Sequence, residues 1–198
     1  MTKTHAPLGR TGALPLAVML CALPVGGVAL WGCDDPFAAL LLDVPETPTE
    51  IVLSDFFTAP IEDAAALDLI TELPAQIEFG PNWDFVFRVE AGRAELATFT
   101  AVTDSTNDAG FFETDLAFDE IEEAPDEGYN LVDPVAVVPG KAVIVRSRRN
   151  PSTIVSCSYY AKIEVLMVDL EAGTVKLQFL RNPNCGDTVL IPGQHGSL

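Results

Sequence analysis

The strongest constraint on the fold is a two-residue alternation of apolar and polar side chains in the last third of the chain. Apolar residues occupy every second position over residues 159–167 and again over residues 175–179. Successive side chains of a β-strand point to opposite faces of a sheet, so each run is typical of a strand with one buried face. Residues 171–173 between them end in a glycine that suits a turn. The sequence therefore predicts an antiparallel hairpin.

The same alternation occurs earlier in the chain. Asp84 and Arg88 fall on one face of residues 83–89, and the other face carries Trp83, Phe85, Phe87 and Val89. This pattern predicts a half-buried strand. Four further segments carry β signals and are separated by glycine and proline turns: residues 96–102, 135–138, 142–146 and 154–160.

One segment has a helical period instead. Between Pro60 and Pro74, apolar residues recur every four positions at Ile61, Ala65, Leu69 and Leu73. Such spacing is typical of one apolar helical face packed on a core, with Pro60 suited to the first turn and Pro74 to the end. We therefore expect a mostly β fold, an antiparallel sheet domain with one short helix.

The N-terminus is typical of an export signal. Lys3 and Arg10 are the only charged residues before an uncharged apolar run over residues 11–32. Two alternatives are an uncleaved membrane anchor and cleavage that releases a soluble protein. The prolines and glycines within the run interrupt a long helix, which favours a cleaved signal.

The end of this run resembles a lipobox, the motif that directs diacylglyceryl attachment to a cysteine. Leu30, Gly32 and Cys33 carry the likeness. It implies a lipoprotein signal peptide over residues 1–32, a lipidated Cys33 with a tether over residues 33–55, and an acidic β-rich domain over residues 56–198. The domain would be exported and held to a membrane of the cell envelope by its lipid, on the periplasmic side or at the outer-membrane surface.

Charge narrows the range of partners. Without Lys3 and Arg10, nine cations remain against all 29 acids, a formal charge of −20 for the part beyond Gly32. An acidic surface repels phosphate backbones and anionic lipid headgroups, which argues against nucleic-acid binding and against membrane docking by charge.

The cysteines agree with export. Cys21 lies in the signal and Cys33 is the lipid site, which leaves Cys157 and Cys185 as a pair. The alternatives are a disulfide and a two-cysteine metal site. The sequence favours the disulfide, because it has no CxxC spacing and only His195 remains as an imidazole ligand.

No catalytic constellation is found. The sequence lacks GxSxG, phosphate-loop, Rossmann and HExxH motifs, and a Ser/His/Asp triad would depend on His195 near the C-terminus. Residues 104–110 alternate oxygen-bearing side chains, but their glycine comes one position late for an EF-hand and the closing glutamate is missing. We therefore expect neither an enzyme nor a metal site.

Three groups of motifs together resemble the HmuY family, heme-capturing lipoproteins of bacterial outer membranes. The first is Asn-Trp-Asp-Phe-Val-Phe-Arg at residues 82–88, and the second is Phe-Asp-Glu-Ile with Ala-Pro and Tyr over residues 118–129. The third consists of the segments at residues 140–146, 160–163 and 173–179. The resemblance implies a mostly antiparallel β fold, a lipid-tethered location and heme as cofactor.

The best-known members of that family place a pair of histidines on the heme iron, whereas His195 is the only histidine after the signal. Thioether and phenolate groups also bind heme iron, so Met167, Tyr159 and His195 are the ligand candidates, with Tyr129 and Tyr160 beside them. Met167 and Tyr159 share the apolar hairpin face, which favours their being core residues over their being iron ligands.

Two functions follow from these observations. One is a lipid-anchored binding module for heme or another small apolar ligand. The other is a non-catalytic structural or interaction lipoprotein without a cofactor, which would expose an apolar patch to its protein partner.

Overall fold

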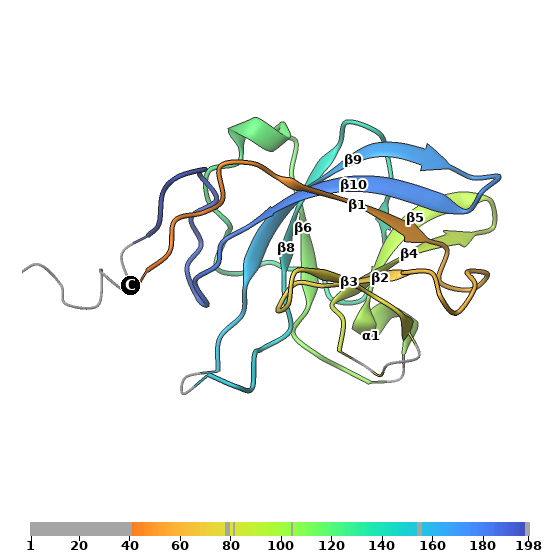
Figure 1. Ribbon diagram of the computed structural model, residues 1–198, viewed down its shortest axis with the longest axis horizontal. Helices are drawn as coiled ribbons and strands as arrows, with labels where there is room; N and C mark the ends of the chain where they lie inside the picture. Colours follow the sequence, from red (N-terminus) through yellow and green to blue (C-terminus); the bar gives the residue numbers. More distant parts are fainter. Residues whose placement is uncertain (1–40, 78–79, 81, 104, 154–155, 197–198) are drawn as a thin grey trace, which may run out of the picture. The chain divides into compact units, whose positions relative to one another are not determined.

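The computed structural model describes residues 41–77, 80, 82–103, 105–153 and 156–196 (Figure 1). The predicted signal peptide and Cys33 lie outside these residues. Within them, no helix has the length and hydropathy needed to span a membrane.

The first sheet has five antiparallel strands in the order β1-β10-β9-β8-β6. The hairpin predicted near the C-terminus forms its centre, shown in blue in Figure 1. The strands are β1 (Thr49–Ser54), β6 (Gly110–Glu113), β8 (Ala142–Arg146), β9 (Tyr160–Asp169) and β10 (Thr174–Arg181).

The second sheet is also five-stranded and antiparallel, in the order β3-β2-β4-β5-β7. Its strands are β2 (Ala66–Asp68), β3 (Leu73–Ala75), β4 (Phe85–Glu90), β5 (Arg93–Thr98) and β7 (Val135–Ala136). A two-residue turn at Ala91 and Gly92 joins β4 to β5, as the turn signal predicts.

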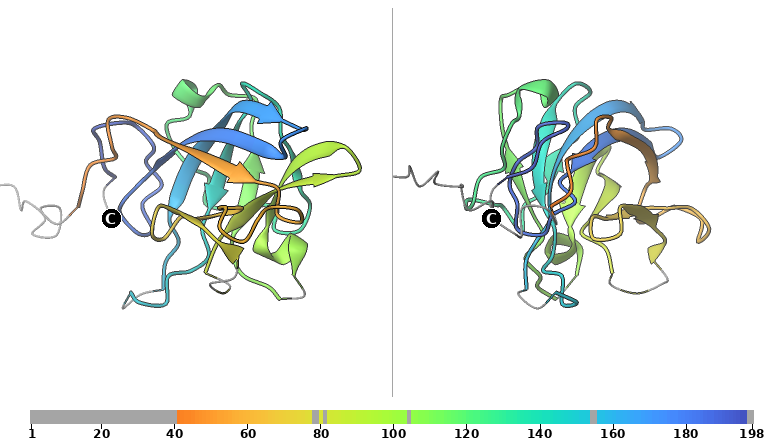
Figure 2. Two further views of the ribbon diagram at one scale, coloured as in Figure 1. Left: turned by 45° about the vertical axis from the view of Figure 1, so that its right-hand side comes forward. Right: turned by 60° about the vertical axis from the view of Figure 1, so that its left-hand side comes forward.

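The inner faces of the two sheets share one hydrophobic core, and Figure 2 shows the sheets from two sides. Phe85 and Phe87 of the second sheet meet Phe111, Ile163 and Leu177 of the first. The rings of Phe85 and Phe111 lie edge to face, with centroids 5.5 Å apart. The expected mostly β, antiparallel fold is thus confirmed.

Both outer faces are covered as well. Residues 114–131, including the 3₁₀ helix η3 (Phe118–Glu120), pack on the first sheet around Ile144. Lys162 of β9 is buried beneath this segment and donates from Nζ to the carbonyl of Ile121 at 2.8 Å. Trp83 and Phe99 cover the second sheet.

The helix expected between Pro60 and Pro74 is absent from the described structure, where β2 and β3 occupy that segment. Positions four apart share one face of an extended strand as well as one face of a helix, so the spacing did not discriminate between helix and strand. Ile61 and Leu73 are exposed. The α-helix is α1 (Phe99–Val102), and the Thr98 side chain caps it by accepting from the N–H of Ala101 at 3.2 Å.

Other strand predictions need correction. β4 is buried on both faces rather than one, because α1 and its aromatic neighbours cover the outer side, and Asp84 beside it is fully buried. The strand expected over residues 96–102 gives way to α1 after Thr98. The strand expected over residues 135–138 is shorter, since β7 ends at Ala136. Of the strand expected over residues 154–160, residues 154 and 155 lie outside the described residues, and β9 begins only at Tyr160.

Candidate functional site

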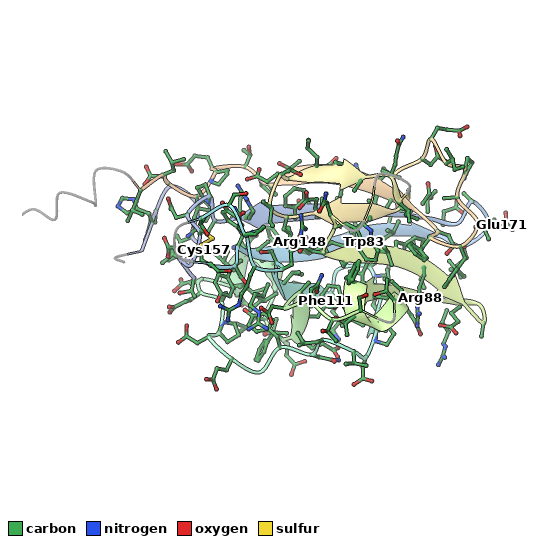
Figure 3. The ribbon with its side chains drawn as sticks, turned by 90° about the horizontal axis from the view of Figure 1, so that it is seen from below. Trp83, Arg88, Phe111, Arg148, Cys157 and Glu171 are labelled. Atoms are coloured by element: carbon green, nitrogen blue, oxygen red, sulfur yellow. A yellow bond between two sulfur atoms is a disulfide. The ribbon has the colours of Figure 1, made fainter. Side chains whose placement is uncertain are left out.

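The structure does not bring Met167, Tyr159 and His195 together. Tyr159 directly precedes β9, and Met167 lies eight residues further along the extended chain, about 26 Å away at 3.3 Å per residue. Figure 3 marks these two ends of the domain by the labels Cys157 and Glu171. These three side chains therefore cannot ligate one iron atom.

Each of the three has another role. The Tyr159 ring lies under the guanidinium of Arg181, 4.3 Å from its centroid. Met167 is 56 % exposed, because a register shift between Lys176 and Leu177 turns it outward, and the core interpretation of Met167 is therefore wrong. His195 is exposed, with Nδ1 2.7 Å from Asp43 Oδ1.

The predicted disulfide is confirmed. Cys157 and Cys185 form a disulfide across a separation of 28 residues, with Cα atoms 5.6 Å apart. Among the described residues there is no group of three His, Cys, Asp or Glu side chains that could hold a metal ion. The disulfide holds the chain before β9 against the loop after β10.

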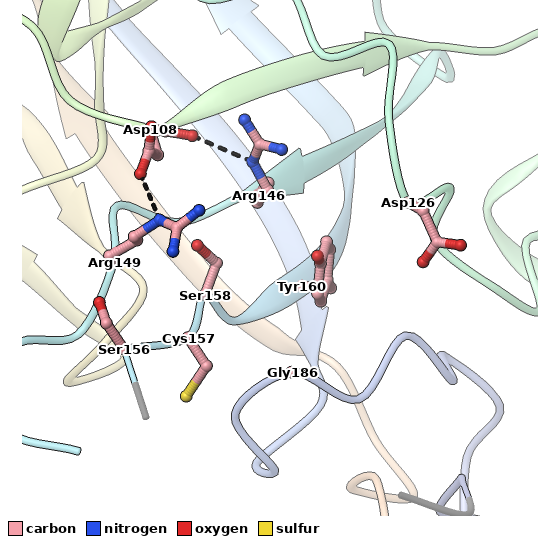
Figure 4. Close-up of a pocket in the computed structure, with 9 residues that line it drawn as sticks. All are labelled: Asp108, Asp126, Arg146, Arg149, Ser156, Cys157, Ser158, Tyr160 and Gly186. Carbon is pink, nitrogen blue, oxygen red and sulfur yellow. Dashed lines mark hydrogen bonds and ion pairs between the residues drawn. The ribbon is translucent and has the colours of Figure 1, made fainter. Parts of the chain in front are cut away.

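Beside the disulfide lies a polar hollow of about 330 Å³, which we name the arginine pocket (Figure 4). Residues distant in the sequence line it, because β6, β8 and β9 are neighbours in the first sheet. Arg146 is the last residue of β8 and pairs with Tyr160, the first residue of β9. The lining residues are Asp108, Asp126, Arg146, Arg149, Ser156, Cys157, Ser158, Tyr160 and Gly186.

Asp108 orients both arginines. Its carbonyl accepts from Arg146 Nε at 3.1 Å, and its carboxylate accepts from Arg149 Nε at 2.7 Å. Within the described part of the chain, no hydrogen bond engages the Nη groups of either arginine. In Figure 4 the two arginines reach toward Asp108 on one side of the hollow, and Asp126 stands on the other. The free Nη groups are the donors that carboxylates and phosphates bind.

Two aromatic rings, those of Tyr129 and Tyr160, lie beside Arg146 at the arginine pocket. The Arg146 guanidinium lies over the Tyr129 ring, 4.6 Å from its centroid, and that ring lies 6.2 Å from the Tyr160 ring. Burial is the main cause that raises the pKa of the Tyr129 hydroxyl well above its ordinary value of 10. Tyr129 therefore stays neutral, and its ring helps to fix the Arg146 guanidinium by cation–π contact.

Our sequence interpretation missed these arginines, although a signal was present. Arg146, Arg148 and Arg149 are three of the nine cations that follow the predicted signal, and they stand within four consecutive residues. A basic cluster in a strongly acidic chain marks a place where an anion can bind.

A separate apolar patch lies at the start of the second sheet. Phe57 is 62 % exposed and Ile61 is 69 % exposed. A hollow of about 270 Å³ beside them is lined by Phe56, Ile61 and Ile77 among others. The interaction hypothesis predicts an exposed patch of this kind.

Comparisons of the chain with protein-family models, curated proteins and solved structures find no match.

Proposed function

We propose that this chain is an exported, lipid-anchored binding protein of the cell envelope that holds a small anionic ligand in its arginine pocket. The observation that carries the proposal is the pair Arg146 and Arg149, which Asp108 orients while their Nη groups stay free of hydrogen bonds to the described residues. A carboxylate or phosphate group is the complementary ligand.

The exported location is supported by the signal-like segment, by the lipobox-like residues before Cys33 and by the disulfide, which is typical of oxidising compartments. Labelling of cells with radioactive palmitate tests the anchor. We expect label on the parent protein and none on a Cys33→Ala variant. An unlabelled parent protein would refute the lipid anchor without bearing on the pocket.

Anion binding is tested by calorimetric titration with inorganic phosphate and with acetate. Arg149→Ala should weaken both by about tenfold, since it removes a charge-assisted hydrogen-bond donor. Arg93→Ala is the matched control, because its side chain is 76 % exposed at the β4–β5 turn. Asp126→Asn should strengthen binding by about threefold, because it removes a negative charge from the rim. No binding by the parent protein would refute the proposal.

Heme is the second candidate ligand, and one observation favours it. Heme carries two carboxylates, and the arginine pocket places Tyr160, a possible phenolate ligand of iron, beside Arg146 and Arg149. Titration with hemin should then shift the Soret band in the parent protein and not in a Tyr160→Phe variant. An unchanged Soret band would exclude heme as the ligand and would not contradict the small-anion proposal.

A further inference from the structure

Two further hollows adjoin the arginine pocket on the outer face of the first sheet. A second hollow, of about 390 Å³, shares Asp126 with it. A third hollow, of about 500 Å³, shares Thr114 and Leu116 with the second. We call the three together the furrow. It runs between β8 and the segment that begins at Thr114 and crosses the outer face of the sheet.

The three hollows follow one strand in order. Ala142 lines the third hollow, Ile144 lines the second, and Arg146 lines the first. Alternate residues of a strand share one face, so these side chains form a straight row about 13 Å long. Phe112 of β6 pairs with Ile144 and widens the floor at the centre of this row.

The chemistry of the furrow changes along the row. At one end are the two arginines, whose Nη groups have no hydrogen bond to the described residues. The central hollow is lined by apolar residues, among them Leu116, which is 50 % exposed, and Pro125, and also by Thr114, Glu123 and Asp126. Val138, 48 % exposed, stands at the far end. Lys141 at that end is already paired, with its Nζ 2.6 Å from Glu113 Oε2. An anionic group is therefore favoured at the Arg146 end only.

Building on the proposed anion site, we infer that the furrow binds a single-chain amphiphile, with its carboxylate or phosphate head at Arg146 and Arg149 and its alkyl chain against the half-exposed side chains of Leu116 and Val138. Such a ligand matches both halves of the surface: the head replaces water at two guanidinium groups, and the chain covers apolar side chains.

A peptide fits this surface less well. Its backbone N–H and C=O groups would need partners. The edge of β6 above the furrow is already used at Phe111, which exchanges two backbone hydrogen bonds with Asn130, at 2.9 and 2.8 Å. An alkyl chain has no such requirement. The surface of an anionic membrane is also disfavoured, because the chain carries a formal charge of −18.

The test is a calorimetric series of acetate, hexanoate, octanoate and decanoate, each below its micelle concentration, on the full chain carrying Cys33→Ser, which cannot be acylated. Affinity should rise with chain length, by up to about fourfold for each methylene that becomes buried. Arg149→Ala should weaken every member of the series by a similar factor.

Leu116→Glu places a charge on the wall and should abolish the dependence on chain length while acetate binds as before. Leu170→Glu is the matched control, since Leu170 is 53 % exposed beside the β9–β10 turn, and it should leave the series unchanged. Circular dichroism checks that both variants are folded.

Three outcomes separate the two proposals. If acetate binds and decanoate binds no tighter, the furrow takes no alkyl chain and the anion site still stands. If the dependence on chain length persists in Leu116→Glu, the alkyl chain lies elsewhere and the inference is overturned. If no member of the series binds, the proposed function fails and the inference fails with it.

Discussion

The carboxylate of Asp84 accepts the backbone N–H of Arg148 at 2.7 Å and pairs with the guanidinium of the same residue at 3.1 Å. Asp84 directly precedes β4 of the second sheet, and Arg148 follows β8 of the first. The pair therefore links the two sheets at the edge of their shared core. Asp84 also accepts the N–H of Leu69 at 2.7 Å, and Arg148 is paired with Asp68 at 2.9 Å.

Replacing Asp84 with Asn should destabilise the protein by about 3 kcal/mol, because an amide offers one acceptor oxygen where the carboxylate serves three donors. The NH₂ group would face a backbone N–H in a site with no solvent exposure. Urea unfolding followed by tryptophan fluorescence measures the loss. Glu171→Gln, an exposed acid near the β9–β10 turn, is the control and should change the free energy of unfolding by less than about 0.5 kcal/mol.

The same carboxyl makes stability depend on pH. Burial is the main cause that raises the pKa of Asp84 from 3.8 to about 6, against the opposing charge of Arg148. Between pH 3.8 and about pH 6, Asp84 keeps a proton in the folded state that it has lost in the unfolded state. Its contribution to the free energy of unfolding therefore falls as the pH rises. The fall totals about 3 kcal/mol at most and is complete above pH 6.

Carbon-13 NMR of the Asp84 carboxyl, recorded as a function of pH, gives the midpoint of its titration directly. A midpoint near 4 would contradict the pKa of about 6. Urea midpoints recorded at several pH values should also separate the parent protein from Asp84→Asn, whose profile lacks this contribution.

Much of the first sheet can be predicted from local pattern. β8 has the predicted bounds, and the β9–β10 hairpin forms where the alternation of apolar residues places it. In β10, Val175, Leu177 and Phe179 are buried in the shared core and the residues between them are half-buried, which gives the two-residue period. β8 is buried on both faces, because residues 114–131 cover its outer side. The period fails at Met167, because β9 has one extra residue, Leu166, opposite Lys176 and Leu177 of β10, and this reverses its inward and outward positions.

The second sheet and the site depend on distant contacts instead. β2 lies between β3 and β4 with Ala66 and Leu67 both fully buried, so no alternation marks it as a strand. The arginine pocket unites residues from Asp108 to Gly186. Only the sheet order β9-β8-β6 and the disulfide bring them together, and neither can be read from local spacing.

Removing the disulfide should cost stability and weaken the pocket. Cys157 and Cys185 close a loop of 28 residues, which corresponds to about 3 to 4 kcal/mol in chain entropy. We expect a Cys157→Ser, Cys185→Ser double variant to unfold at lower urea concentration and to bind phosphate more weakly, because Ser156 and Ser158 lose their covalent link to the Gly186 loop and keep only the hydrogen bond from Gly186 N–H to the Ser158 carbonyl. A reductant should destabilise the parent protein to the same extent and leave the double variant unchanged. A double variant as stable as the parent would refute this prediction.

The turn between β4 and β5 offers a gain in stability. Ala91 has φ 51° and Gly92 has φ 77°, and Glu90 pairs with Arg93 across the turn. Two central residues with positive φ are typical of a type I′ turn, for which Asn-Gly is the preferred pair, whereas a β-carbon at Ala91 is strained in the left-handed region. Ala91→Asn should therefore raise the free energy of unfolding by about 0.5 to 1 kcal/mol.

Ala172→Asn in the β9–β10 turn is the matched control, since Ala172 is exposed and lacks a positive φ. An equal gain at both positions would show that asparagine acts through something other than turn geometry.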